Sequence, residues 1–197
     1  MTESGMALSN PYRGERRPGY VGQSLPDVSV QLVDEGGGIV TGEGTPGEIQ
    51  IQSPTVFLEY WGNAEATESS FSDGWFCTGD IAVIEGGYYR IMGRSSIDII
   101  KSGGYKLSAL EIENKLLAHP QIAEVAVVGI ADRTWGEAVA AVVALKGAGD
   151  MTLDTLKSWC DGKLSSYKVP KQLQVVDALP RNAMGKVVKP ALKPLFE

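Results

Sequence analysis

The first half of the chain contains short stretches in which apolar and polar residues alternate. Residues 28–33 and 47–52 show this period of two, which predicts half-buried strands. Two further apolar stretches, 81–84 and 88–92, flank a Glu-Gly-Gly turn and are typical of a β-hairpin. We therefore expect residues 18–93 to form a β-rich module.

Beyond Arg94 the pattern changes to helical stretches that alternate with apolar strands. Ser108 and Glu111 form a capping box, in which the serine hydroxyl accepts from the Glu111 amide while the Glu111 carboxylate reaches back. The helix that this box opens runs toward His119, and Thr152 is expected to cap a second helix. Strands are expected over residues 125–130, 138–145 and 172–176. The pattern predicts a compact α+β domain of about 100 residues.

Composition and charge narrow the class of protein. The chain has 197 residues, of which 43% are hydrophobic and 21% charged, as in globular proteins. A formal net charge of -6 argues against a general nucleic-acid surface. No apolar stretch approaches the roughly 18 residues of a membrane span, and the first residues lack the features of a signal peptide. We expect an intracellular protein, cytoplasmic or organellar, with the mitochondrion possible if a transit peptide lies upstream.

Several conspicuous side chains are expected to be structural. Cys77 and Cys160 form no CxxC pair and are expected to be free thiols, and His119 is expected to lie at a helix end. One histidine and two distant cysteines exclude zinc sites and a Ser-His-Asp triad. Tyr60 and Trp61 are expected to plug the core of the first module.

Two segments of the first module offer groups for a nucleotide. Thr2 carries a hydroxyl that can donate to a phosphate, and Glu3 an oxygen that can bind magnesium. Asp80 can accept from two vicinal hydroxyls, as in a ribose, and Gly79 before it permits close backbone approach. A frayed terminus and a simple β-turn are the alternative interpretations of these segments.

Two further segments lie after the β-rich module. Arg94 supplies a fixed fork of donors, and the pair Gly103-Gly104 could admit a thin substrate past the backbone. Lys186 follows a glycine, so it can sit on a mobile loop and bridge two anions that repel each other as they react. A hairpin with a Gly-Gly turn, and a solvated surface lysine, are the alternatives.

Four ordered motifs carry a resemblance to a known family. GEIQIQSPTVFLEYW, WFCTGD, GRSSIDIIKSGGYKLSALEIE and PRNAMGK follow the order and spacing of the adenylate-forming superfamily, which includes acyl-CoA synthetases, luciferases and peptide-synthetase adenylation domains. The opening MTE resembles the tail of the family's YGxTE motif. We therefore expect a fragment of a longer protein, without the upstream phosphate loop and most of the acyl pocket.

The resemblance implies an α/β fold with two parts. Residues 1–94 would be the β-rich, distorted-barrel end of the family's large N-terminal adenylation domain. Residues 95–197 would be its small, mobile α+β C-terminal domain. Family members often carry Asp or Lys at the hinge two residues after the arginine, whereas this chain has Ser96.

The resemblance also implies roles for residues of the first part. Thr2 would contact the nucleotide phosphate, Glu3 would assist Mg²⁺, and Asp80 would hold the ribose hydroxyls with Arg94 beside it. ATP is the implied nucleotide.

In the second part, Ser102 and Gly103 would border the path of the coenzyme A pantetheine. Lys186 would be the catalytic lysine of the adenylation step, brought in by one domain orientation and withdrawn by the next.

The implied activity is that of an ATP-dependent carboxylate–CoA ligase. SNPYRGERRPGYVGQSLPDV resembles the matching stretch of malonyl-CoA synthetases, and so does the SxxDIIKxGGYKxSALE variant of the third motif. Malonate or methylmalonate is therefore the expected acid. Arg13, Arg16 and Arg17 could meet a second substrate carboxylate or simply form a solvated basic loop. A carrier-loading adenylation domain and a non-catalytic fragment are the alternatives, and the isolated chain is expected to be inactive.

Overall fold

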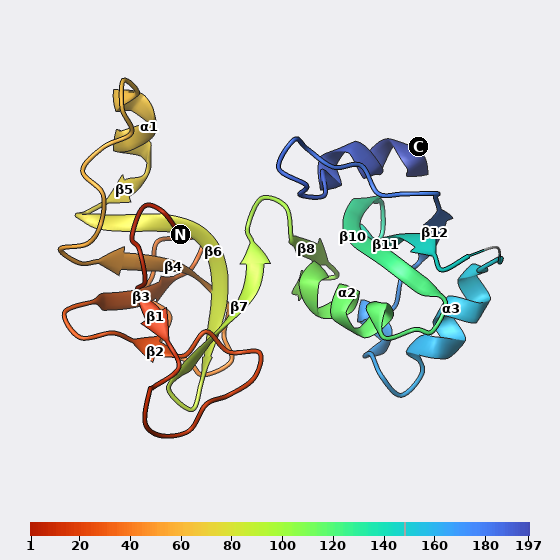
Figure 1. The fold of residues 1–197 in the computed structure, drawn as a ribbon, viewed down its shortest axis with the longest axis horizontal. Coiled ribbons are helices and arrows are strands. Elements are labelled where there is room, and N and C mark those ends of the chain that lie inside the picture. Colours follow the sequence, from red (N-terminus) through yellow and green to blue (C-terminus); the bar gives the residue numbers. More distant parts are fainter. Residues whose placement is uncertain (148) are drawn as a thin grey trace. The chain divides into compact units, whose positions relative to one another are not determined.

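The computed structural model describes residues 1–147 and 149–197, which form two compact units (Figure 1). The first unit comprises Met1–Ile91 and the second Met92–Glu197. Strand β7 (Tyr88–Arg94) runs across this division.

The first unit is built on a five-stranded sheet with the order β3-β4-β6-β5, in which β7 also pairs with β6. These strands are β3 (Ser29–Val33), β4 (Gly47–Gln52), β5 (Phe71–Ser72) and the long β6 (Trp75–Glu85). The ribbon of β6 curves strongly along its length (Figure 1). A two-stranded sheet, β1 (Leu8–Ser9) with β2 (Gln23–Ser24), and one short helix, α1 (Ala64–Ser69), complete the unit.

The alternating stretches form strands whose apolar residues enter the core. Leu32, Ile49, Ile51 and Ala82 pack with Ala7 into the core of this unit. The predicted hairpin also forms, and the φ angles of 58° and 77° at its two central glycines suit the tight turn between twisted strands. The predictions of a β-rich module and of these strands are confirmed.

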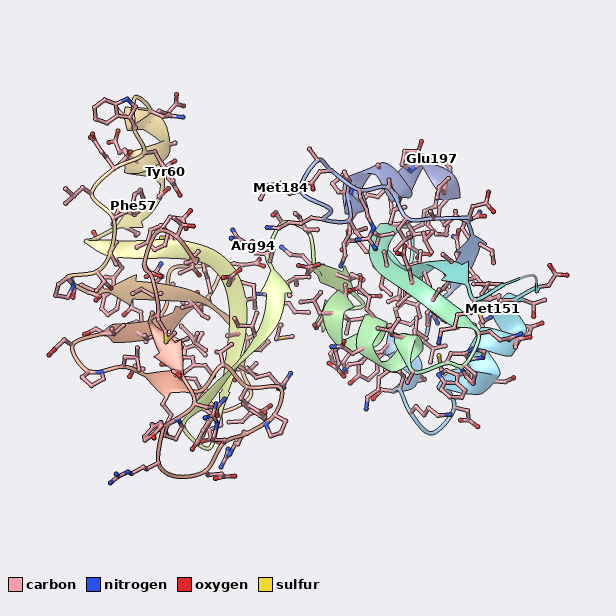
Figure 2. The ribbon with its side chains drawn as sticks, viewed as in Figure 1. Phe57, Tyr60, Arg94, Met151, Met184 and Glu197 are labelled. Atoms are coloured by element: carbon pink, nitrogen blue, oxygen red, sulfur yellow. The ribbon has the colours of Figure 1, made fainter. Side chains whose placement is uncertain are left out.

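The predicted aromatic plug is wrong for Trp61, whose exposed fraction is 94%. Tyr60 does join a cluster with Phe57, Phe71 and Phe76 (Figure 2 labels Phe57 and Tyr60). The Tyr60 amide donates to the Thr67 hydroxyl at 2.9 Å, which fixes a turn before α1. Neighbouring side chains at this turn diverge, so the tryptophan faces solvent while the tyrosine is half-buried.

The second unit is built on another five-stranded sheet, with the order β10-β11-β8-β9 and β12 parallel to β11. Its strands are β8 (Ile99–Ser102), β9 (Tyr105–Ser108), β10 (Ile122–Asp132), β11 (Gly136–Leu145) and β12 (Gln172–Val175). Its α-helices are α2 (Ala109–Leu117) and α3 (Leu153–Cys160), and its 3₁₀ segments are η1 (Ser166–Lys168) and η2 (Lys189–Phe196). The helices and strands predicted here are confirmed.

The central hairpin of this sheet, β10 with β11, is covered on both faces. On one face Val127 and Val139 pack against residues of α2 and α3, such as Ile112 and Leu156. On the other face the alternate residues of both strands pack against the C-terminal segment, which contributes Leu179, Leu192 and Phe196. This double burial explains why residues 138–145 are apolar without alternation.

The helix caps agree with the sequence in part. The Ser108 and Thr152 hydroxyls accept from the amides of Glu111 and Thr155, at 3.1 and 3.2 Å. The second arm of the predicted capping box is wrong, because the Glu111 carboxylate accepts from Lys168 Nζ at 2.6 Å. The nearby ammonium group attracts the carboxylate more strongly than a neutral amide would.

Within the described ranges, no helix has the length and apolar character needed to cross a bilayer. Cys77 and Cys160 carry free thiols.

Candidate functional site

Asp80 lies at a bulge in β6. On β4, Glu48 and Gln50 are two residues apart, but their partners on β6, Ile81 and Cys77, are four residues apart. The residues between these partners therefore stand out of the ladder. Such bulges redirect side chains and are frequent next to active sites.

Hydrogen bonds hold the bulge in shape. Gly79 has a φ angle of 72°, and its amide donates to the Glu48 carboxylate at 2.8 Å. The buried Thr78 hydroxyl donates to the Ile49 carbonyl at 2.8 Å and accepts from the Asp80 amide at 3.1 Å. The backbone that carries Asp80 is thus fixed by groups on both sides of the bulge.

Asp80 lines a pocket of about 410 Å³ that lies wholly within the first unit. Most of the lining is apolar, and Thr78 and Ser4 add hydroxyl groups. The apolar contributors are Met1, Met6, Ala7, Leu8, Val21, Ile49, Ile51 and Ile91. A flat, partly apolar ligand with hydroxyl groups that reach a carboxylate suits such a lining.

Thr2 and Glu3 lie beside this pocket, since Met1 and Ser4 on either side of them line it. Thr2 is exposed, whereas Glu3 is half-buried and accepts from the Tyr60 hydroxyl at 3.2 Å. The Glu3 carbonyl accepts from the amide of Phe57 at 2.7 Å. The terminus is therefore tied down at Glu3, and the frayed-end interpretation does not fit it.

Ser102 and Gly103 belong to the hairpin between β8 and β9, so the Gly-Gly hairpin interpretation describes the local fold. Gly103 and Gly104 have φ angles of 58° and 82° and make a two-residue turn. The Gly103 amide donates to the carbonyl of Trp135 at 2.9 Å. A Cβ atom at Gly103 would lie only 2.8 Å from Cε3 of Trp135, so the glycine permits close approach of the indole ring.

The sequence predictions did not single out Trp135, which contacts the Gly-Gly turn. Trp135 is 47% exposed, and its ring forms one wall beside the Gly-Gly turn. The available signal was the position of a tryptophan directly before Gly136, at the start of an apolar strand.

Lys186 lies on an exposed but ordered loop. The Asn182 amide donates to the Lys186 carbonyl at 2.9 Å, and the Asn182 side chain accepts from the amides of Met184 and Lys186, both at 3.0 Å. Arg181 donates to the Gly185 carbonyl at 2.7 Å. Met184, labelled in Figure 2, is 79% exposed near the tip of the loop.

Arg94 lies at the exposed end of β7, where the chain makes a turn closed by Asp98. The Arg94 amide donates to Asp98 Oδ2 at 3.0 Å, and the Asp98 amide donates to the Arg94 carbonyl at 2.8 Å. Ser96, at the expected hinge position, is exposed within this turn.

The basic loop near residue 17 has a structural role in the case of Arg17. Its guanidinium pairs with Glu15 at 3.0 Å, donates to the Glu85 carbonyl at 3.0 Å, and lies 4.2 Å from the centre of the Tyr88 ring. The hydrogen bond from Arg17 lowers the pKa of Glu15. Arg17 therefore holds the loop against the hairpin of β6 and β7, a structural role that neither interpretation from the sequence included.

Comparison with known proteins places both units in one class. The family model of the AMP-binding enzymes matches residues 1–61, and the model of the AMP-binding enzyme C-terminal domain matches residues 111–186. The chain therefore belongs to the adenylate-forming superfamily of AMP-binding enzymes.

Its relatives include malonate–CoA ligases. The chain is 50% identical to the mitochondrial malonate–CoA ligase ACSF3 of Mus musculus over 98% of its length, and 47% identical to the malonate–CoA ligase of Arabidopsis thaliana over its whole length. It spans 36% and 34% of these two proteins. Among solved structures, ATP-bound MatB from Rhodopseudomonas palustris matches the whole chain with a TM-score of 0.85 and 40% identity, over 39% of the MatB chain.

Proposed function

We propose that this chain forms the C-terminal part of an ATP-dependent carboxylate–CoA ligase that acts on malonate or methylmalonate. The observation that carries the proposal is the match to malonate–CoA ligases along essentially the whole chain. The chain spans about a third of those relatives, so the activity belongs to an assembly with the remaining parts of such an enzyme. The mitochondrial malonate–CoA ligases among the relatives suit an intracellular site, which includes the mitochondrion.

The nucleotide would lie against the first unit. Asp80 would accept from the two ribose hydroxyls, and its fixed backbone would hold the carboxylate ready for them. Thr2 would donate to a phosphate, and Arg94 would contribute its guanidinium to the same nucleotide. Glu3 would hold Mg²⁺, which typically binds one or two protein carboxylates together with substrate phosphates. The ion would screen the phosphate charges.

Lys186 would act in the first half-reaction. A malonate carboxylate attacks the α-phosphorus of ATP, the bond to pyrophosphate breaks, and malonyl-AMP forms. The ammonium group would neutralise the two anions as they approach, and removal of such a donor typically costs about 10²–10³-fold in rate. The ordered loop suits this role, because it fixes the lysine backbone and leaves the side chain exposed.

In the second half-reaction the thiolate of coenzyme A attacks the acyl carbon and AMP leaves. Ser102 and Gly103 would border the pantetheine arm, with Trp135 as a wall beside it. Residues 95–197 would present the Lys186 loop first and the Gly103 hairpin second, which is a known way for one mobile domain to serve two steps.

The half-reactions can be tested in a chimera in which residues 1–197 replace the matching stretch of MatB. We expect malonate-dependent pyrophosphate release from the chimera, and a loss of about 10²–10³-fold on Lys186→Ala. Formation of malonyl-CoA from supplied malonyl-AMP should be retained. Lys157→Ala, on helix α3, is the control. Equal loss of both half-reactions on Lys186→Ala would refute the assigned role.

The isolated chain is expected to release no pyrophosphate from ATP and malonate. The physical reason is that the chain spans about a third of the relatives that carry the activity, so the Asp80 pocket would supply only part of a site for both substrates. A sensitive phosphate-coupled assay on the purified chain checks this. Malonate-dependent release above a no-acid control would contradict the expectation.

A further inference from the structure

A second lysine, three residues after Lys186, is buried in the second unit with two carboxylates. Lys189 is only 9% exposed, and its Nζ lies 2.5 Å from Asp98 Oδ1 and 2.7 Å from Glu113 Oε1. Removing three charged groups from water is costly unless the charges pair and their remaining donors and acceptors are hydrogen-bonded. The cluster of Lys189, Asp98 and Glu113 meets that condition, since each carboxylate has a further partner.

The first carboxylate ties the cluster to the turn after β7. Asp98 Oδ2 accepts from the Arg94 amide at 3.0 Å, so the aspartate closes the turn and pairs with the lysine at once. Gly93 packs directly against it, because a Cβ atom there would lie 2.3 Å from Cβ of Asp98. The position of Lys189 is thus coupled to the backbone of Arg94.

The second carboxylate ties the cluster to the body of the unit. Glu113 lies on α2, and its Oε1 accepts from the Val127 amide of β10 at 2.7 Å. Burial raises the pKa of Glu113, while the ammonium of Lys189 acts in the opposite direction. The cluster therefore joins the turn, a helix and the central hairpin.

The chain passes from this cluster straight into the Lys186 loop. The Val188 amide donates to the Pro180 carbonyl at 2.8 Å, and Val187 forms a bridge with Arg181. Val187 and Val188, the two residues between Lys186 and Lys189, are thus both paired with the segment that begins the loop. A shift of Lys189 would consequently be transmitted to Lys186.

We propose that Lys189 is a positioning residue for the adenylation step, which holds the Lys186 loop and the turn after Arg94 on one rigid base. This inference rests on the proposed function for its catalytic consequence. An apolar side chain could fill the same volume, but it would not bind two carboxylates at fixed points. The cluster therefore fixes the position of the Lys186 loop relative to the turn after Arg94.

The structural part can be tested on the 197-residue chain by amide hydrogen exchange. Lys189→Met should speed the exchange of the Gly185, Val188 and Asp98 amides at least tenfold, relative to amides between β10 and β11. Lys189→Arg should restore part of the protection. Lys168→Met removes another lysine paired with a glutamate of α2 and should leave these amides unchanged. Unchanged exchange in Lys189→Met would overturn the inference.

The catalytic part can be tested in the MatB chimera. Lys189→Met should lower kcat for malonyl-AMP formation at least tenfold, with the KM for ATP and the thioester step from supplied malonyl-AMP within threefold of the parent. Asp98→Asn leaves the lysine paired with Glu113, so it should fold even if Lys189→Met does not, and it should lower the same kcat by a smaller factor.

The outcomes separate the two proposals. If the parent chimera forms no adenylate, the proposed function fails, and hydrogen exchange still decides the positioning role. If the parent is active but both variants adenylate normally, or lose both half-reactions equally, Lys189 is merely structural and the inference is wrong.

Discussion

Glu85, at the end of β6, accepts hydrogen bonds from a charged guanidinium and from a neutral hydroxyl. Arg90 donates to its carboxylate at 2.7 and 3.3 Å, and the Tyr20 hydroxyl donates to the same carboxylate. The bond from Arg90, followed by that from Tyr20, lowers the pKa of Glu85 below its usual value of 4.5. The stability that this group contributes is present above pH 4.5 and is lost as the pH falls through the lowered pKa of the folded state.

Arg90→Gln is therefore expected to raise the pKa of Glu85 toward 4.5, since its strongest donor is gone. An NMR titration of the side-chain carboxyl carbon measures this directly. Arg13→Gln, an exposed change in the basic loop, serves as the control and should leave that pKa in place. An unchanged pKa of Glu85 in Arg90→Gln would show that Tyr20 alone lowers this pKa.

Residues whose role depends on distant partners were the ones that sequence patterns missed. From the sequence Lys189 would be taken for a surface lysine, because Asp98, with which it pairs, is 91 residues away in the chain. Trp135 reads as an ordinary strand-flanking residue until its contact with Gly103 is known. Trp61 fails in the opposite sense, because hydrophobicity predicts burial but a local turn directs this side chain outward.

At the scale of elements, the start of α2 combines a cap with a tertiary contact. Ser108 Oγ accepts from the Glu111 amide and also donates to the Met92 carbonyl at 2.5 Å, in a buried position. Thr152 caps α3 at an exposed position. The two caps therefore form a natural comparison.

Ser108→Ala should cost more stability than Thr152→Ala, about 2–3 against about 1 kcal/mol, because it also strands a buried carbonyl. Urea unfolding of the two variants provides the measurement. Equal costs would mean that the bond to Met92 contributes nothing.

His119, the single histidine of the chain, follows directly after the C-terminal cap of α2. His119 is buried with its ring 4.8 Å from that of Trp159, and its Nδ1 accepts from the Gln121 amide at 3.2 Å. Burial, and secondarily the charge of Lys163, lowers the pKa of His119 below 6.5. The expected helix-end position is confirmed.

The unfolded chain therefore binds a proton at His119 more readily than the folded chain does. Stability from this group is present above pH 6.5 and is lost as the pH falls through the lowered folded pKa. Urea unfolding at pH 7.5 and pH 5.5 should show a larger loss for the parent chain than for His119→Gln. An equal loss in both proteins would contradict the assignment.

At the scale of the whole molecule, the spacing of apolar residues along the sequence predicted most of the strands and both main helices. Burial of one face of an element imposes that spacing. The continuous apolar stretches of β10 and β11 fit burial on both faces, but they could not identify the segments that cover each face. The bulge at Asp80 was equally hidden, because it depends on the pairing of β6 with β4. The motifs predicted the candidate site residues, and the fold shows how the backbone presents them.

The two units each have their own core, so core truncations should act locally. Ile49→Ala in the first unit and Ile112→Ala in the second should each cost about 2–5 kcal/mol. Residue-resolved hydrogen exchange should show lost protection only in the unit that carries the change. Equal loss in both units would mean that they unfold as one.

The central claim is that Asp80, set on its bulge, holds the ribose of the adenylate. A crystal structure of the MatB chimera with ATP bound tests it most directly. We expect both ribose hydroxyls at hydrogen-bond distance, about 2.5–3.0 Å, from the Asp80 carboxylate oxygens. A ribose bound elsewhere, with Asp80 turned away from the nucleotide, would contradict the account.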